Sequence, residues 1–379
     1  MDKRIEIMLS ELASEFMALS NVESVVLSGS FARDEGCIVE RDGIVVPQKD
    51  FDIYLFVSGS VTGVGDIMER FRTKYNLDEH FEIIAGIIPV LHLSFLPPDI
   101  SKYELKVHGK VLAGKDYLSR IKVAKEDIPH VAAWRLLANK VKALIFFNPS
   151  VSAGEGTYER MIYETQKTYV EIATVFSLFG DFYESTYEGR LQRLKDGGYL
   201  QFQSIFEKYP SLLQKIEFAT SYRRNPSAYT IPTPERDWFE ARDTLLYMFC
   251  FVSQRVFDFR SETVQQCVER LREVLPGRYY APYFQYYFSR LHIPYKYLVN
   301  PLSWLTYHYQ CDDWSRRRYE NYYMFRMYLA GPCLLATYGQ ENDSELFHLA
   351  SSILEIQGDW YTLRESYMKL FFRYADRFN

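Results

Sequence analysis

Two aspartates and a Gly-Ser pair are the residues of this chain whose types and spacing could do chemistry together. Asp50 and Asp52 open the apolar run DFDIYLFV. Because side chains alternate across a strand, both carboxylates project from one face, close to each other. Two carboxylates at such a distance repel unless a cation lies between them, and hard oxygen ligands suit Mg²⁺ or Mn²⁺. The spacing therefore predicts a divalent-metal site.

The Gly-Ser pair, Gly29-Ser30, follows a second apolar run, VESVVLS. Gly29 permits close approach of the backbone. Ser30, where a helical turn is predicted to start, offers a hydroxyl and free N–H groups to a phosphate. Taken singly, a DxD pair is usually a solvated strand edge and a Gly-Ser pair is usually a turn. Their combined order, strand, Gly-Ser, turn, DxD and strand, indicates a metal–phosphate site.

The elements that must position these residues are predicted in the N-terminal part of the chain. The run DFDIYLFV is apolar on both faces, which predicts a central strand covered on both sides. The other expected elements are a helix over 2–19, a strand over VESVVLS, a hairpin in CIVERDGIVVPQ, a helix over 66–76, strands over FEIIAGIIP and VLHLSFLP, and helix and loop over 97–121. From Ile128 onward there is almost no alternating strand pattern. The predicted class is α+β, with an N-terminal α/β domain built on a mixed sheet and a large all-helical C-terminal region.

Composition limits the classes of function. The chain has 379 residues, enough for two or three domains, and 47% of them are hydrophobic. A formal net charge of -5 argues against broad nucleic-acid binding, which needs a basic surface. The five cysteines include no CxxC pair, so neither a zinc site nor a disulfide framework is indicated. We find no signal peptide and no apolar stretch of about 20 residues, so we expect a cytoplasmic protein without a membrane partner.

The order of these features resembles the nucleotidyltransferase superfamily, which includes DNA polymerase β, poly(A) polymerases, aminoglycoside nucleotidyltransferases and the minimal bacterial nucleotidyltransferases. Its signature is a hydrophobic strand, Gly-Ser, a short helix, and Asp-h-Asp-h on the next strand. Gly29, Ser30, Asp50 and Asp52 match that signature. The segment GSFARDEG is also similar to the GS-x-AR-G-E form of the minimal and small-molecule branches, with Asp34 where Gly is usual.

The resemblance implies transfer of a nucleoside monophosphate from an NTP, ATP by default, to an acceptor hydroxyl, with release of pyrophosphate. Asp50 and Asp52 would hold Mg²⁺ or Mn²⁺ as catalytic residues, and Gly29, Ser30 and Arg33 would bind the nucleotide. The acceptor would be a small molecule, a carbohydrate or a protein. Nucleic acid is a less expected acceptor for a chain of acidic balance.

Family members use a third carboxylate on a later strand, and the sequence offers two positions for it. Glu82 lies in the apolar run FEIIAGIIP, where an ionised side chain is costly unless it is paired or metal-bound. The alternative register falls on His92 of VLHLSFLP, which is not a carboxylate. We expect Glu82 to be the third catalytic and metal-binding residue. If His92 holds that position instead, the metal site is weakened.

The sequence is predicted to have three parts. These are a catalytic domain over 1–125, a helical domain over 126–275 that covers the nucleotide cleft, and a Tyr-rich helical region over 276–379. In many family members the helical domain sends a Lys or Arg to the triphosphate, and Lys167 and Arg190 are the candidates here. The competing interpretation of each is a solvated basic residue. We interpret the Tyr-rich region as core or domain packing in preference to an acceptor pocket.

Two other functions stay open from the sequence. One is a catalytically impaired nucleotide-binding or partner-binding protein that retains the fold. The other is a toxin-type or antiviral-type nucleotidyltransferase that acts on RNA or nucleotides.

Overall fold

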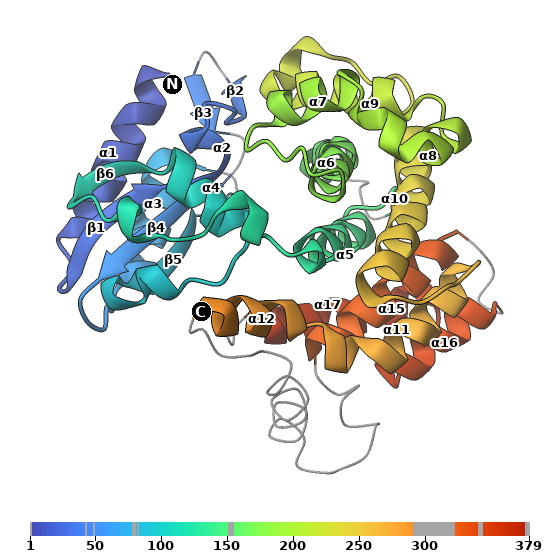
Figure 1. The fold of residues 1–379 in the computed structure, drawn as a ribbon. Helices are drawn as coiled ribbons and strands as arrows, with labels where there is room; N and C mark the ends of the chain where they lie inside the picture. The colour runs from blue at the N-terminus through green and yellow to red at the C-terminus, as the bar shows by residue number, and fades with distance from the viewer. Residues whose placement is uncertain are drawn as a thin grey trace. The chain divides into compact units, whose positions relative to one another are not determined.

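The structure is a computed structural model that describes residues 2–41, 44–47, 50–77, 81, 83–150, 155–290, 323–339 and 344–375. It divides into two compact units (Figure 1). Unit 1 comprises Met1–Ile128, Tyr183–Arg193 and Glu217–Thr230, and unit 2 comprises Pro129–Phe182, Leu194–Ile216 and Ile231–Asn379. The chain therefore leaves unit 1 and returns to it twice. The three-part functional division expected from the sequence stays a prediction.

A four-stranded mixed sheet is the framework of unit 1. Its strands are β1 (Val22–Leu27), β4 (Phe51–Val57), β5 (Ile83–Pro89) and β6 (Lys110–Gly114), in the order β5-β4-β1-β6. β1 runs antiparallel to β4 and β6, whereas β4 and β5 are parallel. The predicted hairpin is present as β2 (Ile38–Arg41) and β3 (Ile44–Pro47), which form a separate ribbon. The predicted α+β class with a small mixed sheet and a large helical part is confirmed.

Both faces of the four-stranded sheet are covered, as β4 predicts. Helices α1 (Lys3–Met17) and α3 (Val64–Tyr75) pack with Phe51, Ile53 and Leu55 of β4 on one face. Helix α4 (Ile100–His108) and the 3-10 helix η1 (Val90–Phe95) pack with Phe56 on the other face. Since side chains alternate along β4, Asp52 belongs to the α4 face.

Two elements of unit 1 differ from the sequence prediction. The segment VLHLSFLP forms the 3-10 helix η1, followed by an extended Leu96, and not a strand; it begins directly after Pro89 ends β5. Within it Leu93 is buried while Leu91 and Phe95 are exposed, so its apolar residues do not line one covered face. Conversely, β6 lies in the segment predicted as helix and loop. Its residues are half-buried at the sheet edge, so the alternation that identifies a strand is weak there.

Helices form the described part of unit 2. Trp134 is fully buried and its ring contacts those of Phe249, Phe257, Tyr279 and Tyr328. The helices are α5 (His130–Phe146), α6 (Glu155–Phe179), α8 (Gln203–Lys208), α10 (Pro234–Phe257), α11 (Val264–Arg278), α12 (Ala281–Arg290), α15 (Tyr323–Thr337), α16 (Glu345–Leu354) and α17 (Trp360–Ala375), while α7 (Tyr187–Lys195) and α9 (Leu212–Arg224) are shared with unit 1.

Several of the tyrosines that the structure describes in the C-terminal region, among them Tyr279, Tyr328 and Tyr338, are buried as packing requires, whereas Tyr361 is 51% exposed. Much of the run of tyrosines on which that interpretation was based lies in residues 291–322, outside the described part of the chain. No described helix combines the length and apolar character that crossing a membrane requires.

Candidate metal–phosphate site

The Gly-Ser turn lies directly against the start of β4. The backbone N–H of Ser28 donates to the carbonyl of Asp52 at 2.8 Å, which ties the end of β1 to β4. Gly29 has a left-handed φ of 66° and begins the short helix α2 (Gly29–Ala32). A Cβ atom at Gly29 would overlap the carboxylate of Asp52. Glycine is therefore required here both for its backbone conformation and for the space that this carboxylate occupies.

Asp50 and Ser30, the other residues of the predicted site, are the sequence neighbours of this contact between Gly29 and Asp52. Asp50 directly precedes β4, and Ser30 follows Gly29 in α2; both side chains are half-buried. The carboxylates are hard oxygen donors of the kind that bind Mg²⁺ or Mn²⁺. The donor chemistry fits a divalent cation, and the absence of a Cβ at Gly29 lets the Asp52 carboxylate lie against the Gly-Ser turn.

The third metal ligand stays a prediction. Glu82 lies outside the described residues. Ile83, the first residue of β5, pairs with Phe51, the residue between the two aspartates. His92 lies in η1 with an exposed side chain, and not on the strand where the sequence placed it. Within the described ranges, no group of three or more His, Cys, Asp or Glu side chains could hold a metal ion.

Arg33, which the resemblance assigns to the nucleotide, lies in a cluster of buried ion pairs. Its side chain is 3% exposed. Nε donates to Glu35 at 2.9 Å, and Nη1 donates to Glu104 of α4. Burial by itself would lower the pKa of Arg33, but Glu104, Tyr187 and Glu35 outweigh it, so the pKa is raised. Arg33 is thus a permanent cation whose guanidinium is held by two carboxylates of the protein.

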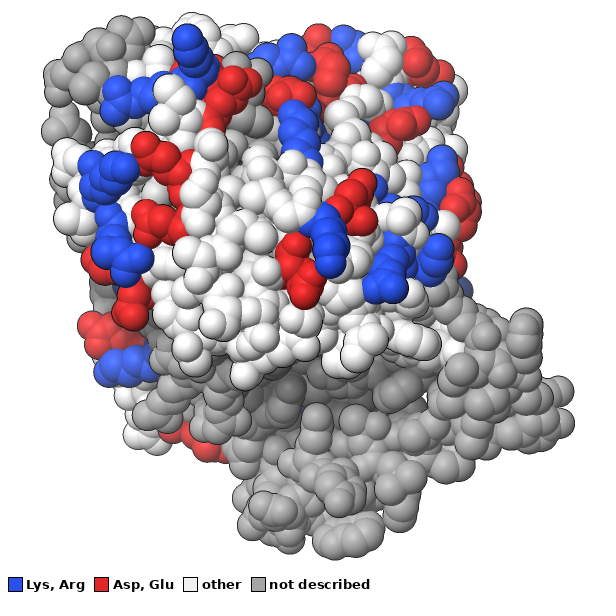
Figure 2. Space-filling model, turned by 90° about the vertical axis from the view of Figure 1, so that its left-hand side faces the viewer, with Lys and Arg blue, Asp and Glu red and all other residues white. Residues whose placement is uncertain are grey.

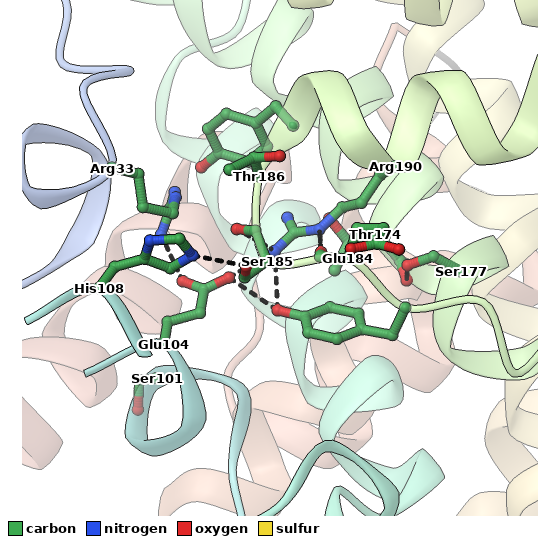
Figure 3. Close-up of polar contacts among 12 residues, drawn as sticks. Arg33, Ser101, Glu104, His108, Thr174, Ser177, Glu184, Ser185, Thr186 and Arg190 are labelled. Atoms are coloured by element: carbon green, nitrogen blue, oxygen red, sulfur yellow. Dashed lines mark hydrogen bonds and ion pairs between the residues drawn. The ribbon is translucent and has the colours of Figure 1, made fainter. Parts of the chain in front are cut away.

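Glu104 joins Arg33 to a second arginine that is distant in the sequence (Figure 3). Its Oε1 accepts from Arg190 Nη2 and, at 2.7 Å, from the Tyr183 hydroxyl. The Arg190 side chain is 2% exposed, and its Nε donates to the carbonyl of Glu184 at 2.6 Å. The interpretation of Arg190 as a solvated residue is therefore wrong, and its contact with a triphosphate stays a prediction.

Tyr187 connects the other side of the cluster. Its backbone N–H donates to Glu35 at 2.7 Å. The guanidinium carbons of Arg33, Arg190 and Arg223 lie 5.0, 5.2 and 4.9 Å from the centroid of its ring, within the range of cation–π attraction. We refer to the group as the Glu104 cluster; its members are Arg33, Glu35, Glu104, Tyr183, Tyr187 and Arg190.

His108, the last residue of α4, lies beside the Glu104 cluster. Its Nε2 is 2.5 Å from the Ser185 hydroxyl oxygen (Figure 3). Burial lowers the pKa of His108, and the positive charge of Arg33 acts in the same direction. The neutral imidazole is therefore favoured in the folded protein.

Lys167, the other basic candidate, is half-buried in α6 of unit 2. Nearby, Lys140 pairs with Glu164 at 2.9 Å. Burial lowers the pKa of Lys140 and the charge of Lys167 acts in the same direction, although Glu164 opposes both. The proposed contact of Lys167 with a triphosphate stays a prediction.

The sequence reasoning gave no role to Glu104, Tyr183 or His108. One signal was present for Glu104. It occupies the segment ISKYELKVH next to Leu105, and a carboxylate on the covered side of a helix needs a buried partner. The identity of that partner could not be read locally, because Arg190 is distant in the chain.

Charged side chains are mixed in sign on the face drawn in Figure 2. Lys and Arg alternate with Asp and Glu around a broad area without charged side chains, and the described residues of this face form no continuous basic stripe. That nucleic acid is a less favoured partner stays a prediction.

A scan against protein-family models finds no match, and searches of curated proteins and of solved structures find none either. A functional proposal therefore depends on the residues and geometry of this chain.

Proposed function

We propose that this chain is a metal-dependent nucleotidyltransferase, which moves an NMP group from an NTP, ATP by default, to an acceptor hydroxyl and releases pyrophosphate. The observation that supports the proposal is the position of the Asp52 carboxylate against Gly29, where β1 meets β4. It brings a carboxylate suited to a divalent cation and a turn suited to phosphate to the same point of the sheet.

Each residue then has a role. Asp50 and Asp52 hold Mg²⁺ or Mn²⁺, and Glu82 completes the metal site. Divalent ions held by these carboxylates would supply Lewis-acid stabilisation of the charge on the transferring phosphoryl group. Ser30 and the backbone at Gly29 bind phosphate oxygens. The protein mainly positions groups and neutralises charge, since phosphoryl transfer asks for little covalent chemistry from it. The acceptor is a hydroxyl of a small molecule, a carbohydrate or a protein.

The test is pyrophosphate release from each of the common NTPs with Mg²⁺ or Mn²⁺, over a panel of acceptors. We expect Asp50→Asn and Asp52→Asn each to reduce release by at least about 100-fold, because each removes charge stabilisation from the transferring group. The matched control is Asp66→Asn, an exposed aspartate of α3, which should retain wild-type release.

Release that persists in Asp52→Asn would overturn the proposal. Calorimetry with Mg²⁺ and a non-hydrolysable NTP analogue separates binding from turnover. Tight binding without pyrophosphate release for any acceptor would indicate a nucleotide-binding protein that retains the fold but not the reaction.

A further inference from the structure

The Gly-Ser turn continues into a loop that is closed by its own backbone. The N–H of Arg33 donates to the carbonyl of Gly29 at 3.3 Å, and the N–H of Glu35 donates to the carbonyl of Ser30 at 2.8 Å. Residues 29–35 therefore form one compact segment. A group that holds the side chain of Arg33 or Glu35 also limits the movement of Gly29 and Ser30.

Both of these side chains are held from outside the loop. Glu104 of α4 accepts from Arg33, while the backbone N–H of Tyr187 donates to Glu35. Glu104 simultaneously accepts from Arg190, so it links the loop to a segment about 150 residues further along the chain. The side chains of Arg33, Glu104 and Arg190 are 3%, 11% and 2% exposed.

Within the Glu104 cluster two arginines are paired with two glutamates, while Arg223, outside the cluster, approaches the Tyr187 ring. Arg33 and Arg190 supply two positive charges, and Glu35 and Glu104 supply two negative ones. A buried charge is tolerated when it is paired and hydrogen-bonded, and it becomes costly when its partner is removed. Replacing Glu104 alone leaves two buried guanidinium groups with one carboxylate, so the cluster can no longer keep its arrangement.

We infer that Glu104 is a positioning residue, which fixes the Gly-Ser turn beside Asp52 by holding Arg33 and Arg190 together. Arg33 and Arg190 then act on the turn through their contacts with Glu104. The inference rests on the proposed function for the identity of the ligand, but the anchoring of the loop depends on the structure alone.

The experiment compares Glu104→Gln with Glu11→Gln, a substitution at a more exposed glutamate of the same unit, 41% against 11% exposed. Glu11 also accepts from a cation and a tyrosine hydroxyl, Lys74 and Tyr75, but it does so between α1 and α3. Two quantities are measured at a temperature at which circular dichroism shows all proteins folded. One is the Kd for a non-hydrolysable ATP analogue with Mg²⁺, and the other is the hydrogen–deuterium exchange rate of residues 29–35.

Glu104→Gln should raise the Kd and the exchange rate at residues 29–35 by about tenfold or more, since small displacements of positioning groups are expensive. Glu11→Gln should change either quantity by less than about twofold, even if its melting temperature falls, because its contacts do not reach the turn. If Glu104→Gln does not fold, Glu104→Asp keeps the charge at a shorter reach. It should give a smaller change of both quantities in the same direction.

Unchanged exchange at residues 29–35 would overturn the positioning role, whatever the binding result. Faster exchange with an unchanged Kd would also overturn it, because the position of the turn would then not govern ligand binding. A wild-type protein that binds no nucleotide would instead refute the proposed function. The exchange data alone would then decide whether Glu104 holds the turn.

Discussion

Gly29 has only a hydrogen atom where any other residue would place a Cβ, and the Asp52 carboxylate occupies that space. Its φ of 66° is also left-handed, which costs an L-residue about 1–2 kcal/mol. We expect Gly29→Ala to lose that much stability and, in addition, to displace the Asp52 carboxylate. The displacement of the carboxylate should abolish Mn²⁺ binding. Mn²⁺ binding is measured by electron paramagnetic resonance in a titration with Mn²⁺.

Gly63 separates these two effects. It has a φ of 85°, but a Cβ there would meet only Leu19 at 3.5 Å, an ordinary contact. Gly63→Ala should therefore show the same loss of stability and unchanged Mn²⁺ binding. Wild-type Mn²⁺ affinity in Gly29→Ala would mean that Asp52 does not contribute to the metal site in the way we propose.

His108 makes a prediction about pH. Its pKa is lowered in the folded protein, mainly by burial, so below the ordinary value of 6.5 the unfolded chain takes up a proton that the folded chain resists. The stability that depends on a neutral His108 is therefore present above pH 6.5 and is lost as the pH falls from there toward the folded pKa. Acidification in this range should lower the melting temperature of unit 1.

The melting temperatures of the wild type and of His108→Asn are measured in buffers between pH 7.5 and 5.5. Amides of β1 and β4 report the unfolding of unit 1. His108→Asn should flatten the dependence. His92→Asn, at an exposed position of η1, should leave the wild-type slope in place. An equally steep slope in His108→Asn would assign the effect to other groups.

At the scale of elements, the sequence correctly predicted the helices and strands that local residue patterns determine. The apolar run of β4, the turn residues of the β2–β3 hairpin and the apolar spacing of α1 are local signals, and each gave the correct element. The 3-10 helix η1 and the edge strand β6 were predicted wrongly, because an apolar segment after Pro89 and a half-buried edge carry no clear period.

The residues of the candidate site likewise fall into those that local sequence patterns predict and those that only tertiary contacts bring together. Gly29, Ser30, Asp50 and Asp52 belong to two short motifs whose order in the chain is informative. The pairing of Arg33 with Glu104, and of Glu104 with Arg190, is tertiary. Isolated basic residues on helices usually face water, so a sequence pattern offers no reason to bury Arg190. The pairing of two arginines with two glutamates in the Glu104 cluster becomes visible only when three separate segments are seen together.

At the scale of the whole molecule, unit 1 is not a continuous stretch of chain. It contains Met1–Ile128 together with the returning segments Tyr183–Arg193 and Glu217–Thr230. The first returning segment supplies Tyr183 and Arg190 to Glu104, and the Tyr187 backbone to Glu35. A fragment of residues 1–128 therefore lacks the partners that bury these carboxylates. We expect it to be less stable than the same unit in the full chain.

Glu104→Gln should have different effects in the two contexts. In the full chain it leaves Arg190 as a buried charge without its carboxylate, which costs about 3–5 kcal/mol. In the fragment Arg190 is missing and Glu104 is exposed to solvent. The Arg33–Glu104 pair is then solvated, so its loss costs less than about 1 kcal/mol of unfolding free energy. Native-state hydrogen exchange of β1 and β4 gives the opening free energy in both contexts. An equal cost in the fragment and in the full chain would show that the segment Tyr183–Arg193 does not bury the pair. The N-terminal unit would then be complete within residues 1–128.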